Sequence, residues 1–423
     1  MKNLILFFLF SLANSANAQS SNGIYGNYNW MSDWTNFKPK TTEYKKPTEV
    51  LSGIIESDKT LLHNKTYILS GIVYVTNNAK LIIEAGTVIR GDYESCGTLV
   101  ITKGSFIIAE GQSDNPIVFT SSKGVSERNP GDWGGIIILG DASINRLGGI
   151  GLLGFDLNQK ICAYGGNNDN SNSGILKYVR IEFPGRKLNS LKELNGLSLA
   201  GVGNKTKIEF VQVSFSNDDS FESYGGNLTL NNLISYRSTD DDFDFTQGTQ
   251  CTISNSLAIR YPYSSDANST SRCFEIDTFD KPDVNDYSKK LTTINAINVT
   301  LVNNEDNNEG LIKEAIYISD KSNFSMESSV VSGFSKLLLL DKKIQVIPVN
   351  LERIKFNGVL VNSCFGIIES ENTLMNPEVA AWFKNLKFGI KPSKITNTTL
   401  FADSVNKAEF DFRLKTSTEL SYK

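Results

Sequence analysis

Two acidic segments of this chain repeat each other 22 residues apart. The first, at 217–226, reads NDDSFESYGG, and the second, at 239–248, reads TDDDFDFTQG. Aligned without a gap, they share two aspartates, a phenylalanine and a glycine, and Glu222 falls on Asp244. A weaker third copy, at 274–277, follows an insertion. Carboxylates at a fixed spacing can bind a cation or exchange protons with a substrate, so these residues are the first candidates for chemistry.

The acids of the three copies are predicted to form a column. If the phenylalanine of each copy points into a core, the acid that follows it points outward, because side chains alternate along a strand. Successive strands would stack at about 4.8 Å, and two like charges about 5 Å apart repel by roughly 3 kcal/mol at an effective dielectric of 20. A cation or bound protons would relieve this repulsion, and oxygen-only ligands suit Ca²⁺. The predicted metal ligands are Asp218, Asp219, Glu222, Asp240, Asp241, Asp242, Asp244, Glu275 and Asp277.

Three interpretations of the acidic column remain open. Asp and Asn are common in solvated turns, a structural calcium is the second interpretation, and a catalytic or sugar-binding cleft is the third. For such a cleft, Tyr224, Arg237 and Arg272 are candidate ligand-binding residues. The catalytic residues stay unknown, because the single histidine, His63, lies far upstream of the acids.

The elements that must position these acids are short strands separated by turns. LIIEAG at 81–86 is echoed by FIIAEG at 106–111, 25 residues later. The segments 176–183 and 208–215 share a pattern at an offset of 32, and the polar insertion at 186–195 accounts for the excess. A unit of 22 to 25 residues holds three strands of about four or five residues and three turns. The chain is therefore predicted to be all-β, a right-handed parallel β-helix, or solenoid.

The ends of the chain differ from the repeats. Residues 1–18 combine a lysine, an apolar run and a small-x-small cleavage site, which predicts a signal peptide and export. Residues 19–49 are expected to form an N-terminal arm whose aromatic side chains cap the first coil. The β-helix is expected at 50–370, and a C-terminal helix and cap at 371–423, with the helix starting at Asn376.

Composition and charge exclude some functions. The net charge is −4, with scattered basic residues, which argues against a nucleic-acid partner. Beyond the predicted signal peptide, no apolar run approaches the roughly 18 residues of a transmembrane segment. Five cysteines leave at least one unpaired. Cys251 and Cys273 lie in adjacent repeats and are candidates for a bridge, the alternative being small buried core residues.

Three segments together resemble a known family. GDWGGIIILG at 131–140 and the acidic segments 218–226 and 240–244 are similar to exported right-handed parallel β-helix proteins of Bacteroidota, of the Trp-Gly-Gly and Asp-Asp-x-Phe-Glu repeat type. The resemblance covers roughly residues 65–370, and the function of most members is unknown. It implies the fold and an exported location, in the periplasm, on the outer membrane or outside the cell. It implies no catalytic residues.

The sequence thus predicts an exported cell-envelope protein with a binding or structural role, stabilised by Ca²⁺ through the stacked acids. The alternative is a polysaccharide-active enzyme, a lyase or glycoside hydrolase, that uses carboxylates on adjacent rungs. The candidate partners are a polysaccharide or an envelope protein.

Overall fold

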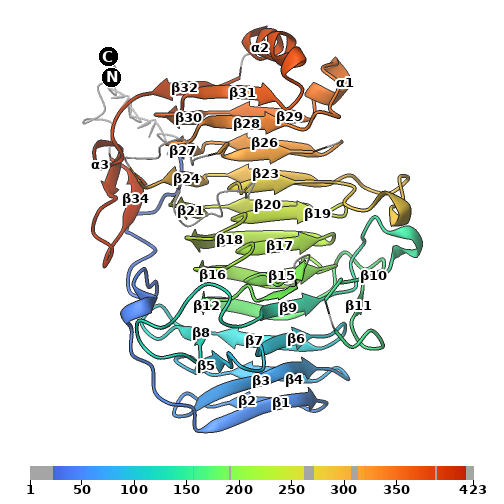
Figure 1. Ribbon diagram of the computed structural model, residues 1–423, viewed down its shortest axis with the longest axis vertical. Helices are drawn as coiled ribbons and strands as arrows, with labels where there is room; N and C mark the ends of the chain where they lie inside the picture. The colour runs from blue at the N-terminus through green and yellow to red at the C-terminus, as the bar shows by residue number, and fades with distance from the viewer. Residues whose placement is uncertain are drawn as a thin grey trace, which may run out of the picture.

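The computed structural model describes residues 22–415 except 156, 190–191, 262–270, 306–312, 320 and 386–387. The predicted signal peptide, at 1–18, lies outside the described residues. Within them, most strands join one continuous, 28-stranded parallel arrangement, in which successive coils stack along the long axis of the molecule (Figure 1). The predicted right-handed parallel β-helix is confirmed.

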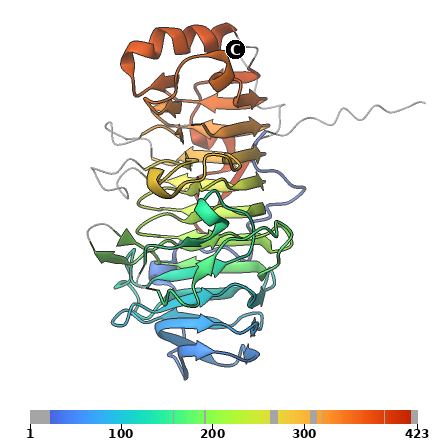
Figure 2. The same cartoon turned by 90° about the vertical axis from the view of Figure 1, so that its right-hand side faces the viewer.

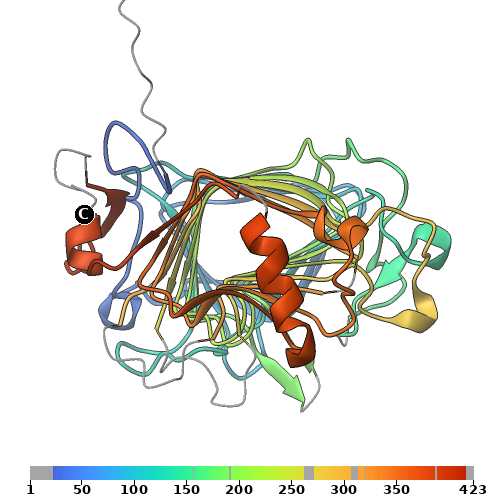
Figure 3. The same cartoon turned by 90° about the horizontal axis from the view of Figure 1, so that it is seen from above.

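The strands form three faces around the core, as the view along the long axis shows (Figure 3). We call the face that carries the acids the acidic face. It begins with the second half of β3 (Thr66–Val75), β6 (Thr98–Ile101), β9 (Gly135–Leu139) and β15 (Leu197–Ala200). It continues through β17 (Phe221–Tyr224), β19 (Phe243–Thr246), β22 (Phe274–Ile276), β25 (Ile316–Ile318), β28 (Lys336–Leu340) and β31 (Gly366–Ser370).

The second face, called the groove face, begins at β2 (Lys59–Leu61), β4 (Lys80–Ile83) and β7 (Phe106–Glu110). It continues through the first halves of β12 (Gly174–Glu182), β16 (Lys207–Ser214) and β18 (Asn227–Tyr236). It ends with β20 (Gln250–Ser254), β23 (Thr293–Ile297), β26 (Asn323–Glu327) and β29 (Ile354–Asn357).

The third face, called the arm face, begins with β1 (Glu49–Ile55) and the first half of β3. It includes β5 (Val88–Gly91), β8 (Ile117–Ser121) and the second halves of β12, β16 and β18. It ends with β21 (Leu257–Arg260), β24 (Thr300–Asn303), β27 (Val330–Ser332), β30 (Val359–Asn362) and β32 (Ile390–Ser393).

A left-handed residue turns the chain from the groove face to the arm face in successive coils. In β12, β16 and β18 this residue interrupts a single long strand, and further up it lies between two short strands. One residue in this conformation redirects the backbone sharply, and Asn tolerates it better than most non-glycine residues. The positions are Tyr178, Phe210, Asn232, Asn255, Asn298, Ser328 and Gly358.

The core contains the predicted stack of phenylalanines. Phe221, Phe243 and Phe274 are at most 1% exposed, and their ring centroids lie 5.4 and 5.2 Å apart. Phe324 and Phe356, from the groove face, extend this aromatic cluster in tilted and edge-on contacts at 5.9 Å per step. Aromatic pairs at this separation contribute to stability beyond the area that they bury. The stack of Phe221, Phe243 and Phe274 therefore helps to fix the register of their strands, and with it the positions of the acids that follow each phenylalanine.

Of the two alternatives for Cys251 and Cys273, the structure shows buried core residues and no bridge. All five cysteines of the chain lie among the described residues, and all five are free. Cys251 and Cys273 are 3% and 0% exposed and belong to the core. They serve as the small core residues that were the alternative interpretation.

The N-terminal arm does not cover the first coil, which corrects that prediction. It runs along the arm face, where Trp30 and Trp34 meet the Phe210 ring at 6.0 and 6.2 Å. The reason is that this face turns apolar side chains outward as well as inward, so it needs a cover. The first coil keeps Val50 and Ile54 65% and 54% exposed.

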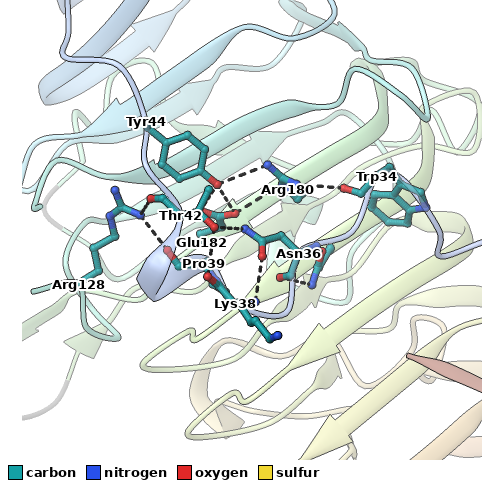
Figure 4. A network of polar contacts seen from close by, with 10 residues as sticks. Trp34, Asn36, Lys38, Pro39, Thr42, Tyr44, Arg128, Arg180 and Glu182 are labelled. Atoms are coloured by element: carbon teal, nitrogen blue, oxygen red, sulfur yellow. Dashed lines mark hydrogen bonds and ion pairs between the residues drawn. The ribbon is translucent and has the colours of Figure 1, made fainter. Parts of the chain in front are cut away.

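A polar network fastens the arm to the β-helix (Figure 4). Tyr44 Oη lies 2.8 and 3.0 Å from the two carboxylate oxygens of Glu182, to which it donates. Arg128 Nη1 donates to the carbonyls of Pro39 and Thr42, at 2.8 Å each. Glu182 and Arg128 are only 1% exposed, so the arm provides partners that buried charges require.

The C-terminal segment covers the other end and then returns to the arm. Helix α2 (Asn376–Asn385) lies across the last coil (Figures 1 and 3) and buries Val379 completely, as predicted for a C-terminal helix. The chain then forms α3 (Asn397–Leu400) and a hairpin of β33 (Phe401–Asp403) and β34 (Asp411–Leu414). The smaller helices are α1 (Pro348–Leu351) and the 3₁₀ turns η1 (Pro39–Thr41), η2 (Leu147–Gly149), η4 (Pro282–Val284) and η5 (Thr373–Met375).

Candidate metal site on the acidic face

The acids that follow the stacked phenylalanines form one register column. Glu222 of β17 pairs with Asp244 of β19, and Asp244 pairs with Glu275 of β22. All three are half-buried, between residues whose side chains are buried in the core. Strand alternation therefore sends these three carboxylates outward on adjacent rungs, and the structure brings them together.

The turns before these strands bring further acids to the same place. Asp219 Oδ1 accepts a 2.9 Å hydrogen bond from the backbone N–H of Asp241, and the Asp241 carboxylate accepts one from the backbone N–H of Arg272. Asp219 and Asp241 are 6% and 4% exposed. Asp218 and Asp240 lie half-buried beside them. These hydrogen bonds hold one acidic turn directly above another.

Asp242 is separated from the other acids. It is completely buried on the inner side of the turn, where Arg260 Nη1 lies 2.9 Å from its carboxylate. The same nitrogen donates to the carbonyls of Asp240 and Arg272, at 2.9 and 2.8 Å. Asp242 and Arg260 form a buried ion pair that holds the acidic turn in shape, which leaves Asp242 no part in an outward metal site.

Two overlapping sets of carboxylates are close enough to share a cation. The first contains Asp218, Asp219 and Asp240, and the second contains Asp219, Glu222 and Asp244. In each set the ligand oxygens lie within 4.8 Å of one another, and Asp219 belongs to both. Among the residues that the structure describes, no lysine or arginine lies within ion-pair distance of Asp219, Glu222 or Asp244. These are buried acidic clusters that could hold a metal ion.

Burial changes the protonation of these acids. It raises the pKa of Asp244 well above its ordinary value, and the charges of Glu222 and Glu275 raise it further. Burial also raises the pKa of Asp219. The pKa of Glu222 rises only to about 7, because hydrogen bonds from Tyr224 and Asn195 to its carboxylate offset part of the burial. Without a cation, the cluster holds protons that ordinary carboxyl groups would have lost.

Asn195 is a neighbour that the sequence did not identify. Together with the hairpin of β13 (Lys187–Asn189) and β14 (Lys192–Glu193), it comes from the polar insertion at 186–195. Its Nδ2 donates to Glu222 and, at 3.2 Å, to Tyr224 Oη. Asn195 is 2% exposed, and its Oδ1 has no hydrogen-bond partner in the described part of the chain. A buried amide oxygen without a donor is a suitable further ligand for a hard cation.

A second insertion covers the same edge. It contains a short hairpin of β10 (Gly151–Leu152) and β11 (Ala163–Tyr164), which projects from the coils on the right-hand side of Figure 1, the side that faces the viewer in Figure 2. The Tyr164 ring lies 6.4 Å from the Tyr224 ring, and Tyr164 Oη donates to Gln247 at 2.9 Å. These contacts explain why the acids are half-buried even though they point away from the core.

The candidate ligand-binding residues lie in two places. Tyr224 is part of the cluster, since its hydroxyl donates to Glu222. Arg272 lies at the edge of the cluster: its guanidinium is 3.3 Å from Glu314, and its Nε and Nη1 have no partner among the described residues. Arg237 is elsewhere, with its guanidinium 3.8 Å above the Tyr261 ring, in the aromatic cluster under the arm.

The remaining predicted ligand and the histidine lie outside the column. Asp277 follows β22, where its backbone N–H donates to Phe245 and its charge raises the pKa of Glu275 and Asp244. His63 pairs with Glu84 at 2.8 Å, near the first coil, and is exposed. The structure therefore places no histidine beside the acids.

Comparison with known proteins agrees with the fold. A family model described as a pectate-lyase-like β-helix domain matches residues 53–416. Comparisons with curated proteins and with solved structures find no match. The match supports the β-helix part of the resemblance drawn from the sequence, while the Bacteroidota origin and the repeat type stay predictions. Of the described helices, none is long and apolar enough to cross a membrane.

Proposed function

Because the chain belongs to the pectate-lyase-like β-helix family, we propose that it is an exported calcium-binding protein of the cell envelope. The observation that carries the proposal is the position of Asp219, whose carboxylate is shared by two sets of three acids within 4.8 Å. Calcium would stabilise the acidic turns and present them as a binding or structural surface.

The electrostatic cost of the cluster favours a bound cation. Each pair of ionised acids about 5 Å apart costs roughly 3 kcal/mol at an effective dielectric of 20, and Asp219, Glu222 and Asp244 have no basic partner among the described residues. Ca²⁺ takes six to eight oxygen ligands in a flexible geometry, whereas Mg²⁺ requires a near-ideal octahedron and keeps several waters. Asp219, Glu222 and Asp244 would hold the inner cation, and the Asn195 amide would add its Oδ1 after a rotation that exchanges it with the Nδ2 now facing Glu222.

In an exported protein, a calcium site of low affinity would be enough to stabilise the fold. Extracellular calcium modules bind with dissociation constants of roughly 10⁻⁴–10⁻³ M. A site of that strength, at a free calcium concentration ten times its dissociation constant, would add about 1.4 kcal/mol to the free energy of unfolding. Export itself rests on the predicted signal peptide.

Thermal unfolding of the protein with calcium and with EDTA tests the proposal. We expect the wild type to melt at a higher temperature with calcium, and Asp244→Asn to lose that difference. Asp114→Asn, at an exposed turn far along the sequence from the cluster, is the matched control and should respond like the wild type. An unchanged melting temperature of the wild type on chelation would rule out the calcium site.

A second candidate function is favoured by one specific observation. Glu222, with a pKa of about 7, lies beside Asp244 on the next rung, and burial raises the pKa of Asp244 well above its ordinary value. A carboxyl group with a pKa near neutral, beside a second carboxyl group whose pKa is raised, suits general acid and base catalysis on a polysaccharide. Assays for reducing ends and for unsaturated products would detect a glycoside hydrolase and a lyase. Activity that Glu222→Gln abolishes would support the enzyme, and no cleavage of any glycan tested would exclude it while leaving the calcium site intact.

A further inference from the structure

A polar recess lies on the groove face, on a different side of the β-helix from the acids. It has a volume of about 450 Å³, within the roughly 300–1,000 Å³ of small-molecule sites. Its floor is formed by β23, β26 and β29, and the short helix α1 stands beside it, near the upper end of the molecule (Figure 1). We propose that this recess binds a small hydroxylated anion, of the sugar-acid or sugar-phosphate class.

The floor offers hydrogen-bonding groups at regular spacing. Asn295, Ser325 and Lys355 occupy one register column on successive rungs, and Thr293 pairs with Asn323 in the next. Their inward neighbours are buried, so these side chains point out into the recess. Rungs repeat at about 4.8 Å. A ligand with several hydroxyl groups could therefore meet a polar side chain on each rung.

The floor groups are already partly oriented by one another. Ser325 Oγ donates to Asn295 Oδ1 at 2.7 Å, which fixes the direction of the Asn295 amide and leaves its N–H groups for a ligand. Asn323 Nδ2 donates to Thr293 Oγ1 at 3.2 Å. Phe324, between Asn323 and Ser325, is only 1% exposed. The floor thus recognises a ligand by hydrogen bonds, because it presents no aromatic ring on which a flat molecule could stack.

The recess is basic at the β29 end of its floor. Arg353 and Lys355 both line it, and neither has an acidic partner within ion-pair distance in the described chain. Arg353 Nε is buried without a hydrogen-bond partner, and its Nη1 makes only a long, 3.4 Å bond to the Lys321 carbonyl. Since a buried donor without an acceptor is costly, an anion in the recess would provide what Arg353 lacks.

The charge of the recess contrasts with that of the whole chain. The protein carries a net charge of −4, whereas the recess is lined by two basic residues and a single acid, Glu352. Helix α1 is held in place by Leu351, 3% exposed, and turns the 58% exposed side chain of Val349 toward the opening. Val349 offers an apolar contact, the floor offers hydrogen bonds to hydroxyl groups, and the basic side chains of Arg353 and Lys355 attract negative charge. Together these groups select an anion that has a carbon skeleton with hydroxyl groups.

Calorimetric titration of the full-length protein with four probes tests the proposal. The probes are glucuronate, glucose 6-phosphate, neutral glucose and inorganic phosphate. We expect one of the two sugar anions to bind at least about tenfold more tightly than glucose or inorganic phosphate, since both the charge and the hydroxyls contribute. The sugar anion that binds more tightly identifies carboxylate or phosphate as the preferred group.

Variants localise the binding. Arg353→Gln and Lys355→Gln should each weaken it about tenfold or more, while Lys391→Gln, an exposed lysine on β32 of the arm face, should not. Lys355 is exposed, so its variant keeps the fold even if Arg353→Gln does not. Failure of both sugar anions to bind, affinity for inorganic phosphate equal to theirs, or binding that survives both substitutions would overturn the proposal.

Discussion

Asp219 is the residue on which the calcium proposal depends most, because both sets of acids include it. The sequence identified it with the other acids of the repeat, since a repeat of 22 residues stacks equivalent positions. Two details needed the structure. Asp242 turns inward because Arg260, a residue of a different coil, offers it a buried partner. Asn195 reaches the cluster from an insertion. The repeat pattern predicts where the strands stack, but it does not predict how an inserted segment folds over them.

The first residue-scale prediction concerns pH. Burial raises the folded pKa of Glu222 from 4.5 to about 7, so the folded calcium-free protein binds more protons than the unfolded chain between these values. Its free energy of unfolding should therefore fall as the pH rises through this window. Calcium competes with these protons, so its stabilising effect should be larger at pH 8 than at pH 5.

Calorimetric melting at both pH values, with calcium and with EDTA, checks this pH prediction. Glu222→Gln removes the titrating group and should flatten the pH dependence of the calcium-free protein. A calcium effect that is equal at the two pH values would contradict the assignment of these acids as ligands, because ligand carboxylates must lose their protons to bind.

At the scale of elements, the phenylalanine stack should be a large source of stability. Phe243 is completely buried between the rings of Phe221 and Phe274. Phe243→Ala should reduce the free energy of unfolding by about 3–5 kcal/mol, because it leaves a cavity in the ladder. Urea unfolding measures this, with Phe365→Ala as the control, at a side chain that is 80% exposed. Equal losses from the two variants would show that the stack contributes nothing specific.

The strands and the stack could be predicted because they depend on alternation, a local pattern with period two. The position of the arm could not, although the sequence does contain a signal. Leu257, Ala258 and Ile259 are consecutive apolar residues on β21, and all three are completely buried. A strand that is apolar on both sides needs a cover on its outer face. Which segment supplies the cover depends on contacts between residues more than 200 positions apart.

At the scale of the whole molecule, the arm should stabilise the later coils and not the first. Removing residues 22–37 would expose the outer side of the arm face from β12 to β27, since Trp30, Trp34 and Phe37 pack on β12, β16 and β18 and Gly23 bonds to Ser328 before β27. Hydrogen exchange should then accelerate in β21, β24 and β27, while β4 on the groove face keeps its protection. Tyr28→Ser, at a position 74% exposed, is the control and should change neither. Faster exchange confined to the first coils would contradict the observed position of the arm.

The contact between the arm and the C-terminal hairpin changes how the solenoid can unfold. Asn29 Nδ2 donates to the Phe410 carbonyl at 2.7 Å, and Arg413 Nη1 donates to the Gly26 carbonyl at 2.9 Å, across 381 and 387 residues of chain. A simple solenoid behaves as a one-dimensional array, in which end repeats can fray independently. Here the arm is joined to the C-terminal hairpin, so a coil that opens between these two segments does so as a closed loop and not as a free tail. The arm also leaves the ribosome before the coils, yet its contacts with the C-terminal hairpin form only after the last coil exists, which makes the completion of its docking a late step of folding.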